Sequence, residues 1–270
     1  MNKLQSTLIF SAIILIFTGY FLAPNFKTTD QVPNKRHSGH KHNFKLDSLE
    51  SIFLSSLVKP KRDSVAFYKE LLNKENSHKA HLKVSAVYLG LGAYGLAAHY
   101  YIKAFTDSAK SINNILWLKE LEQKEINEDF KHKINESIED ICLEIINKDS
   151  TNYNAMYELA NLNIYNKGDV MSGVQLLLKI SREKPDFLPA QYQLAVLAIR
   201  SAQYEKAIKR LTMLNSKQPK NIDILLNLGK AHHLNGEGDK AITYFNECKK
   251  LAKPEETDMI NQFIKTIINA

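Results

Sequence analysis

The chain has 270 residues, of which 44% are apolar and 24% charged, with ten Gly, seven Pro and a formal net charge of +7. This composition excludes a disordered or collagen-like chain, and the length is sufficient to bury a sizeable core. The two cysteines, Cys142 and Cys248, lie far apart in the sequence, which excludes a disulfide scaffold and a CxxC metal site. Because no strong catalytic signature is present, we predict neither an enzyme nor a cofactor.

The positive charge is concentrated at the start of the chain. Residues 1–45 hold six Lys and Arg against one acid, Asp30, so they account for +5 of the total and the rest of the chain for only +2. A nucleic-acid-binding protein concentrates basic charge on its folded surface. We therefore predict no nucleic-acid partner.

The first 23 residues have the pattern of a membrane anchor. No side chain is charged between Lys3 and Lys27, and residues 8–22 are almost wholly apolar. As a helix the charge-free stretch would reach about 34 Å, against about 30 Å of hydrocarbon in a bilayer. We expect an uncleaved anchor over residues 1–23. A cleaved signal peptide is the alternative, although Phe21 and Pro24 disfavour a cut after Ala23.

The orientation of this anchor follows from two opposing features. The basic residues after it, Lys27 and the cluster at 35–45, favour a cytoplasmic body by the positive-inside rule. A short basic start followed by an apolar run is instead typical of an export signal. We expect a single-pass protein with a cytoplasmic N-terminus and a body that is periplasmic or otherwise extracytoplasmic.

Residues 24–45 are polar and basic, and we predict that they form a flexible linker. Within it lie His37, His40 and His42, whose imidazoles could ligate a metal ion. Three histidines on a mobile segment without supporting carboxylates make a poor site. We therefore predict no metal site here, and keep a metal chaperone or an enzyme that uses this cluster as the alternative function.

Residue types recur every 34 positions in the second half of the chain. Pairs with this spacing are Ala207 and Ala241, Leu211 and Phe245, and Leu214 and Cys248. A fixed period with small residues at constant offsets is typical of helical repeat proteins. The pattern resembles the tetratricopeptide repeat (TPR) family, and together with the expected anchor it resembles the membrane-anchored TPR proteins of bacteria.

The resemblance implies an all-α superhelix of about five helix pairs, behind an N-terminal transmembrane helix. The small-residue position of the second helix falls at Ala97, Ile138, Gly173, Ala207 and Ala241. The second unit departs most from the pattern, because we expect residues 124–133 to lengthen its turn. We predict two amphipathic helices at 46–57 and 63–72, within a segment 46–77, TPR repeats at 78–254 and a capping helix within 255–270.

Two other motifs are weaker. Residues 90–95 satisfy GxGxxG after a possible strand at 84–89, but Ile115 stands where a dinucleotide site needs an acid. His232 and His233 are adjacent, so on a helix their side chains diverge and cannot share a metal ion. We expect both motifs to be structural.

In the TPR family, the first helices line a concave groove that binds proteins or peptides. By the repeat pattern, the partner-binding residues here are Tyr157, Asn161, Tyr192, Val196, Arg200, Leu226, Lys230 and His233. The family's carboxylate clamp is absent, because Tyr157 and Asp223 stand where it has cations. The resemblance thus implies a membrane-tethered scaffold with a protein or peptide partner, in assembly of a membrane or exported complex.

Overall fold

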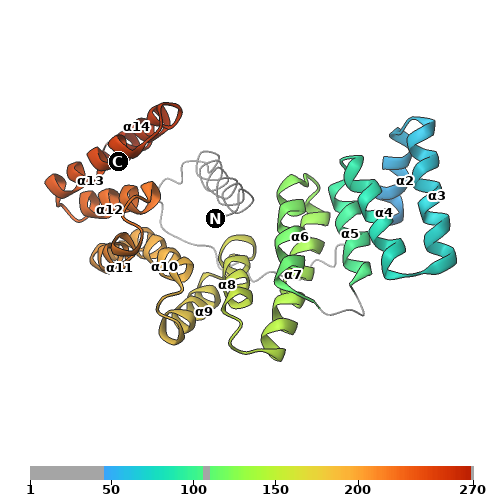
Figure 1. The fold of residues 1–270 in the computed structure, drawn as a ribbon, viewed down its shortest axis with the longest axis horizontal. Coiled ribbons are helices and arrows are strands. Elements are labelled where there is room, and N and C mark those ends of the chain that lie inside the picture. The colour runs from blue at the N-terminus through green and yellow to red at the C-terminus, as the bar shows by residue number, and fades with distance from the viewer. Residues whose placement is uncertain (1–45, 106–109, 269–270) are drawn as a thin grey trace, which may run out of the picture. The chain divides into compact units, whose positions relative to one another are not determined.

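The computed structural model describes residues 46–105 and 110–268, and all regular structure in these two ranges is helical (Figure 1). The described residues belong to one compact unit, Phe44–Ala270. The prediction of an all-α chain is therefore confirmed for this part of the molecule.

Two helices precede the first repeat. Helix α2 spans Leu46–Ser56 and α3 spans Lys59–Glu75. Helix α3 starts four residues earlier than the sequence pattern predicts, at a proline in its first turn. Proline is tolerated there because the first helical N–H groups have no partner within the helix.

Five helix pairs follow, and in each pair the two helices pack against one another. The pairs are α4 (His78–Gly90) with α5 (Tyr94–Ala104), α6 (Ile112–Lys124) with α7 (Glu128–Lys148), α8 (Tyr153–Asn161) with α9 (Val170–Glu183), α10 (Leu188–Arg200) with α11 (Tyr204–Lys217), and α12 (Ile222–Leu234) with α13 (Gly238–Leu251). Helix α8 continues as a single π-helical turn, η1 (Leu162–Asn166). Helix α14 (Pro254–Ile268) ends the described chain and contacts α12 and α13.

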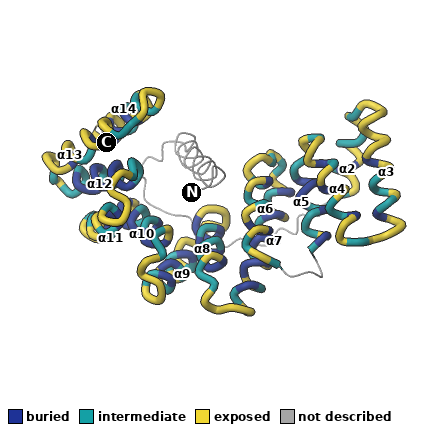
Figure 2. The backbone as a smooth tube through the Cα atoms, viewed as in Figure 1, coloured by how far each residue is buried: buried dark blue, intermediate teal, exposed yellow. Residues whose placement is uncertain are grey.

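Small residues let the paired helices approach closely. Ala97, Ala207 and Ala241, at the expected small-residue positions, are at most 1% exposed. The first helix of the last pair has a small residue as well, Gly229, where an added Cβ would lie 2.3 Å from the Phe245 ring. The apolar side chains around these crossings form the core, and burial alternates with exposure around each helix (Figure 2).

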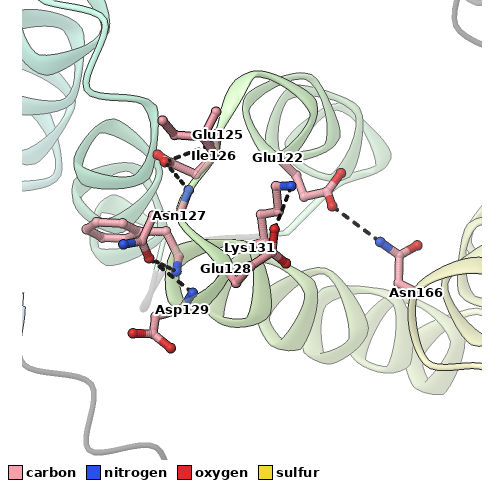
Figure 3. Close-up of polar contacts among 9 residues, drawn as sticks. Glu122, Glu125, Ile126, Asn127, Glu128, Asp129, Lys131 and Asn166 are labelled. Atoms are coloured by element: carbon pink, nitrogen blue, oxygen red, sulfur yellow. Dashed lines mark hydrogen bonds and ion pairs between the residues drawn. The ribbon is translucent and has the colours of Figure 1, made fainter. Parts of the chain in front are cut away.

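The second pair differs from the prediction of a lengthened turn. Its turn holds only residues 125–127, and the extra residues belong to the 21-residue helix α7. Figure 3 shows why the helix starts early: Asn127 Oδ1 accepts hydrogen bonds from the backbone N–H groups of Asp129 (3.0 Å) and Phe130 (3.1 Å). Glu125 accepts further bonds from the N–H groups of Ile126 and Asn127, both at 2.9 Å. These side chains satisfy N–H groups that a helix start leaves without partners.

The GxGxxG segment is the end of one helix and the start of the next. Residues 84–89 lie within α4, so the strand that a dinucleotide site requires is absent from this segment. Gly92 has φ +76°, which suits glycine in the turn. At Gly95 a Cβ would lie 2.2 Å from the ring of Phe130 on α7. These two glycines thus serve the turn and the helix packing.

No helix within residues 46–105 and 110–268 is long and apolar enough to cross a membrane. The predicted anchor (1–23) and the linker with His37, His40 and His42 lie outside the described residues. The structure therefore leaves both as predictions.

Candidate functional site

The predicted partner-binding residues come from the first helices of three successive pairs, which we call the first-helix surface. Tyr157 and Asn161 lie on α8; Tyr192, Val196 and Arg200 lie on α10; Leu226, Lys230 and His233 lie on α12. Arg200 is exposed, and the others except Leu226 are partly exposed. Leu226 is only 2% exposed, so it is buried in the repeat array. Contrary to the prediction, its side chain is therefore not presented to a partner.

Tyr192 is held across two repeats by a hydrogen bond. The amide Nδ2 of Asn227, on α12, donates to the Tyr192 hydroxyl at 2.9 Å and to the backbone carbonyl of Asp223 at 2.8 Å. The partly exposed ring is thereby fixed in orientation between α10 and α12. A rigid aromatic side chain of this kind loses little conformational entropy when it binds a partner.

Tyr157 is more deeply built into the fold than Tyr192. Its ring packs edge-on against Phe187, with centroids 5.7 Å apart. Burial raises the pKa of its hydroxyl, and the neighbouring Asn161 amide partly opposes that rise. Asn161 Oδ1 is itself buried and has no hydrogen-bond partner among the described residues. These two residues therefore contribute to packing as well as to the surface.

The π-helical turn η1 adds a feature that the repeat pattern did not predict. Tyr165, on η1, is 54% exposed, and its hydroxyl accepts a hydrogen bond from Gln193 Nε2 of α10. Asn166, also on η1, donates to Glu122 of α6 at 3.4 Å (Figure 3). The turn thus links the third pair to both of its neighbours. Isolated π-helical turns occur frequently at functional sites. The residue types at 162–166 contain no signal from which a π-helical turn could be predicted.

Helix α12 carries two partly buried charged side chains, Lys230 of the first-helix surface and Asp223. Burial lowers the pKa of Lys230, and the nearby cation of Arg200 lowers it further. About seven residues earlier on α12, burial raises the pKa of Asp223, and the carboxylate of Glu256 on α14 adds to that rise. Aromatic rings, amides and charged side chains suit the binding of a polypeptide segment, which offers backbone hydrogen bonds together with varied side chains.

The candidate nucleophiles and metal ligands in the described part of the chain have structural roles. Cys142 and Cys248 are fully buried, and burial raises the pKa of each thiol to about 12. His232 Nδ1 contacts the carboxylate of Glu237, and its ring stacks on Tyr244 with centroids 5.4 Å apart. No group of three metal-ligating side chains occurs within residues 46–105 and 110–268.

The stacked helix pairs define an α-helical repeat protein, and comparison with known proteins identifies the repeat. Residues 222–254, which cover α12 and α13, match the family model of the tetratricopeptide repeat. The last helix pair is therefore a tetratricopeptide repeat, and the other pairs of the described chain have the same helix-turn-helix arrangement. No curated protein matches the chain.

The solved structures that resemble this chain do so at low sequence identity. A TPR protein from Parabacteroides merdae is 15% identical over 82% of each chain, with a TM-score of 0.53. The MamA protein is 19% identical over 67% of this chain and 94% of its own, with a TM-score of 0.47. YrrB, described as a TPR protein with an unusual peptide-binding site, is 10% identical over 74% of this chain and 97% of its own, with a TM-score of 0.48.

Proposed function

We propose that this chain is a membrane-tethered scaffold that binds a protein or peptide partner on the first-helix surface, in assembly of a membrane or exported complex. The observation that carries the proposal is the partly exposed ring of Tyr192, which Asn227 holds in place across two repeats. Binding energy concentrates at rigid aromatic side chains near the centre of an interface. Tyr192 lies on the middle one of the three helices of this surface.

In this proposal the chain binds rather than catalyses. The TPR fold serves generally as an interaction scaffold, and the thiols and the His232 imidazole that we considered as reactive groups are buried. The TPR repeats occupy residues 78–254, with 46–77 and 255–270 as covers for the two ends of the array. Both ends of a repeat array need such covers because an uncovered repeat exposes its apolar face.

We expect Tyr192→Ala to abolish partner binding while the chain stays folded. The ring packs against the core cluster around Ala207 but is partly exposed, so its removal lowers the melting temperature without unfolding the repeats, whereas a hot-spot aromatic contributes about 2 kcal/mol or more to binding. Proteins captured from membranes by immobilised wild type and variant are compared by mass spectrometry, and melting is measured on the same samples. The control is Thr212→Ala, at an exposed position on α11. Unchanged capture by Tyr192→Ala would place the binding surface elsewhere.

A separate prediction concerns the membrane anchor that we expect at residues 1–23. The full chain is expected to stay in the membrane fraction at its unprocessed mass through high-salt and carbonate washes, because about 20 apolar residues suffice to span a bilayer. Protease added to spheroplasts then reports the side of the body. We expect the body to be digested, because a periplasmic body is accessible in spheroplasts, whereas a cytoplasmic body would be protected by the inner membrane. Release by carbonate, or an N-terminus beginning near Pro24, contradicts the anchor and supports a cleaved signal.

A further inference from the structure

Positive charge is distributed unevenly over the folded unit. Residues 170–220, which contain α9, α10 and α11, hold nine Lys and Arg against three acids, Glu183, Asp186 and Glu205. This is a net charge of +6 in a body whose total is +2. The excess therefore belongs to this part of the array, and a net charge of −4 in the rest of the body offsets most of it.

The basic residues of this segment also differ from the others in their pairing. Many lysines of the earlier helices form ion pairs, such as Lys69 with Glu50, Lys110 with Glu144 and Lys167 with Glu139. None of the nine cations at 170–220 forms an ion pair with a described residue. No acidic side chain of the described residues therefore neutralises their charge, although Arg210 is half-buried and bonded to Ser181 and Gln191.

Exposed apolar side chains lie among these cations on α9. Met171 is 69% exposed and Leu178 is 41% exposed. They are seven residues apart on α9, and Gln175 and Arg182 each follow one of them by four residues. Residues at these spacings lie on the same face of a helix. All four are exposed, so α9 presents a stripe of two apolar side chains separated by Gln175, with a basic side chain at its end.

Helix α11 lies against the same region and adds more cations. Both helices pack on α10, and Arg210 of α11 reaches across to Ser181 of α9, with 3.3 Å between Nη1 and Oγ. Lys206 lies one helical turn before Arg210, and Lys209 lies directly before it. Both lysines are exposed. We define the basic outer surface by Met171, Leu178, Arg182, Lys206 and Lys209.

We propose that the basic outer surface docks on an anionic lipid bilayer. Each Lys or Arg near such a membrane adds about 1 kcal/mol of attraction, and bulky apolar side chains among the cations can enter the headgroup boundary. Nucleic acid fits less well, because this surface has apolar side chains where a nucleic-acid site has aromatic rings for stacking or polar groups for base edges. An acidic protein would not require the exposed Met171 and Leu178 to lie beside the cations.

This proposal is independent of partner binding. The basic outer surface lies on the second helices of two pairs, whereas Tyr192 and its neighbours lie on first helices. A membrane and a protein partner could therefore be bound at the same time.

The test measures binding of residues 44–270 to lipid vesicles, which removes any contribution from the predicted anchor. This segment is a compact unit that contains the core clusters of the described chain, and its fold is checked by circular dichroism and melting. We expect cosedimentation with phosphatidylcholine vesicles that contain 30% phosphatidylserine, and none with phosphatidylcholine alone. Binding should weaken steeply between low and physiological salt, because salt screens charges. Equal binding to both vesicles, or binding to neither, overturns the proposal.

Matched variants localise the effect. Arg182→Glu with Lys206→Glu and Lys209→Glu should reduce vesicle binding by about 100-fold or more, since three attractive charges become repulsive. The control makes the same charge change on α3 and α4, with Lys59→Glu, Lys61→Glu and Lys79→Glu, all at exposed positions. If the control loses as much binding as the first variant, net charge rather than this surface is responsible. Met171→Ser with Leu178→Ser should also weaken binding; unchanged binding, or tighter binding to nucleic acid than to the vesicles, contradicts a lipid partner.

Discussion

Glu50→Ala is expected to destabilise the folded unit by about 3 kcal/mol, the lower end of the range for removing one partner of a buried ion pair, because Glu50 is buried while the Lys69 side chain is 33% exposed. Glu50 lies on α2 and is 5% exposed. Its carboxylate accepts bonds from Lys69 Nζ at 2.7 Å, from the Tyr100 hydroxyl at 3.0 Å and from the Tyr88 hydroxyl. Alanine would leave these three donors without their acceptor, at a point where α2, α3, α4 and α5 meet.

Urea denaturation of residues 44–270 measures this loss, and Glu70→Ala is the matched control. Glu70 also pairs with a lysine, Lys74 at 2.7 Å, but both side chains are exposed. Exposed pairs contribute little to stability. We expect the control to unfold at the wild-type midpoint. If the two variants were equally stable, the network around Glu50 would not hold the N-terminal helices on the first repeat.

The pH dependence of the same samples tests the electrostatic origin of the effect. Burial alone raises the pKa of Glu50, but hydrogen bonds from Lys69, Tyr88 and Tyr100 and the Lys69 charge outweigh it and leave the pKa below its ordinary value. The folded state therefore binds the Glu50 proton less readily than the unfolded state. Its contribution is present above the ordinary glutamate pKa, about 4.3, and is lost as the pH falls through the lower folded value. The stability difference between wild type and Glu50→Ala should narrow accordingly in acid.

The repeat fold could be predicted because it depends on few residues at fixed spacings. Small side chains at Ala97, Ala207 and Ala241 allow two helices to cross closely, and large apolar side chains four residues later in each copy fill the adjacent space. Such a pattern is local in sequence and recurs, so each copy supports the others.

The remaining features depend on contacts that no local pattern contains. Glu50 appears in the sequence as one more acid on an amphipathic helix, and its three donors come from three other helices. The early start of the long helix α7 depends on the capping side chain of Asn127, a position to which the repeat pattern assigns no role. Leu226 occupies a position of the first-helix surface by spacing, yet neighbouring elements bury it. The repeat period of the sequence therefore predicts reliably which helix a residue occupies. It predicts less reliably how much of that residue's side chain is exposed.

Gly229→Val is expected to destabilise the last repeat by about 3 kcal/mol, the upper part of the range for overpacking a core. A Cβ at Gly229 would lie 2.3, 2.6 and 2.9 Å from three carbons of the Phe245 ring. The ring is 3% exposed and so has no free space into which it could move. Helix α12 would have to separate from α13, which would also displace Asn227 from Tyr192 on the neighbouring repeat.

Gly238→Val is the control in the same repeat. Gly238 begins α13, and no described atom lies within 4 Å of an added Cβ there. Its backbone φ lies outside the left-handed region, so a side chain adds no strain, and valine restricts the unfolded chain. We expect wild-type or slightly higher stability in urea for this variant, and a lower midpoint for Gly229→Val. If Gly229→Val melted with the wild type, close contact at Gly229 would not be what holds α12 against α13, and the partner surface on α12 would not depend on it.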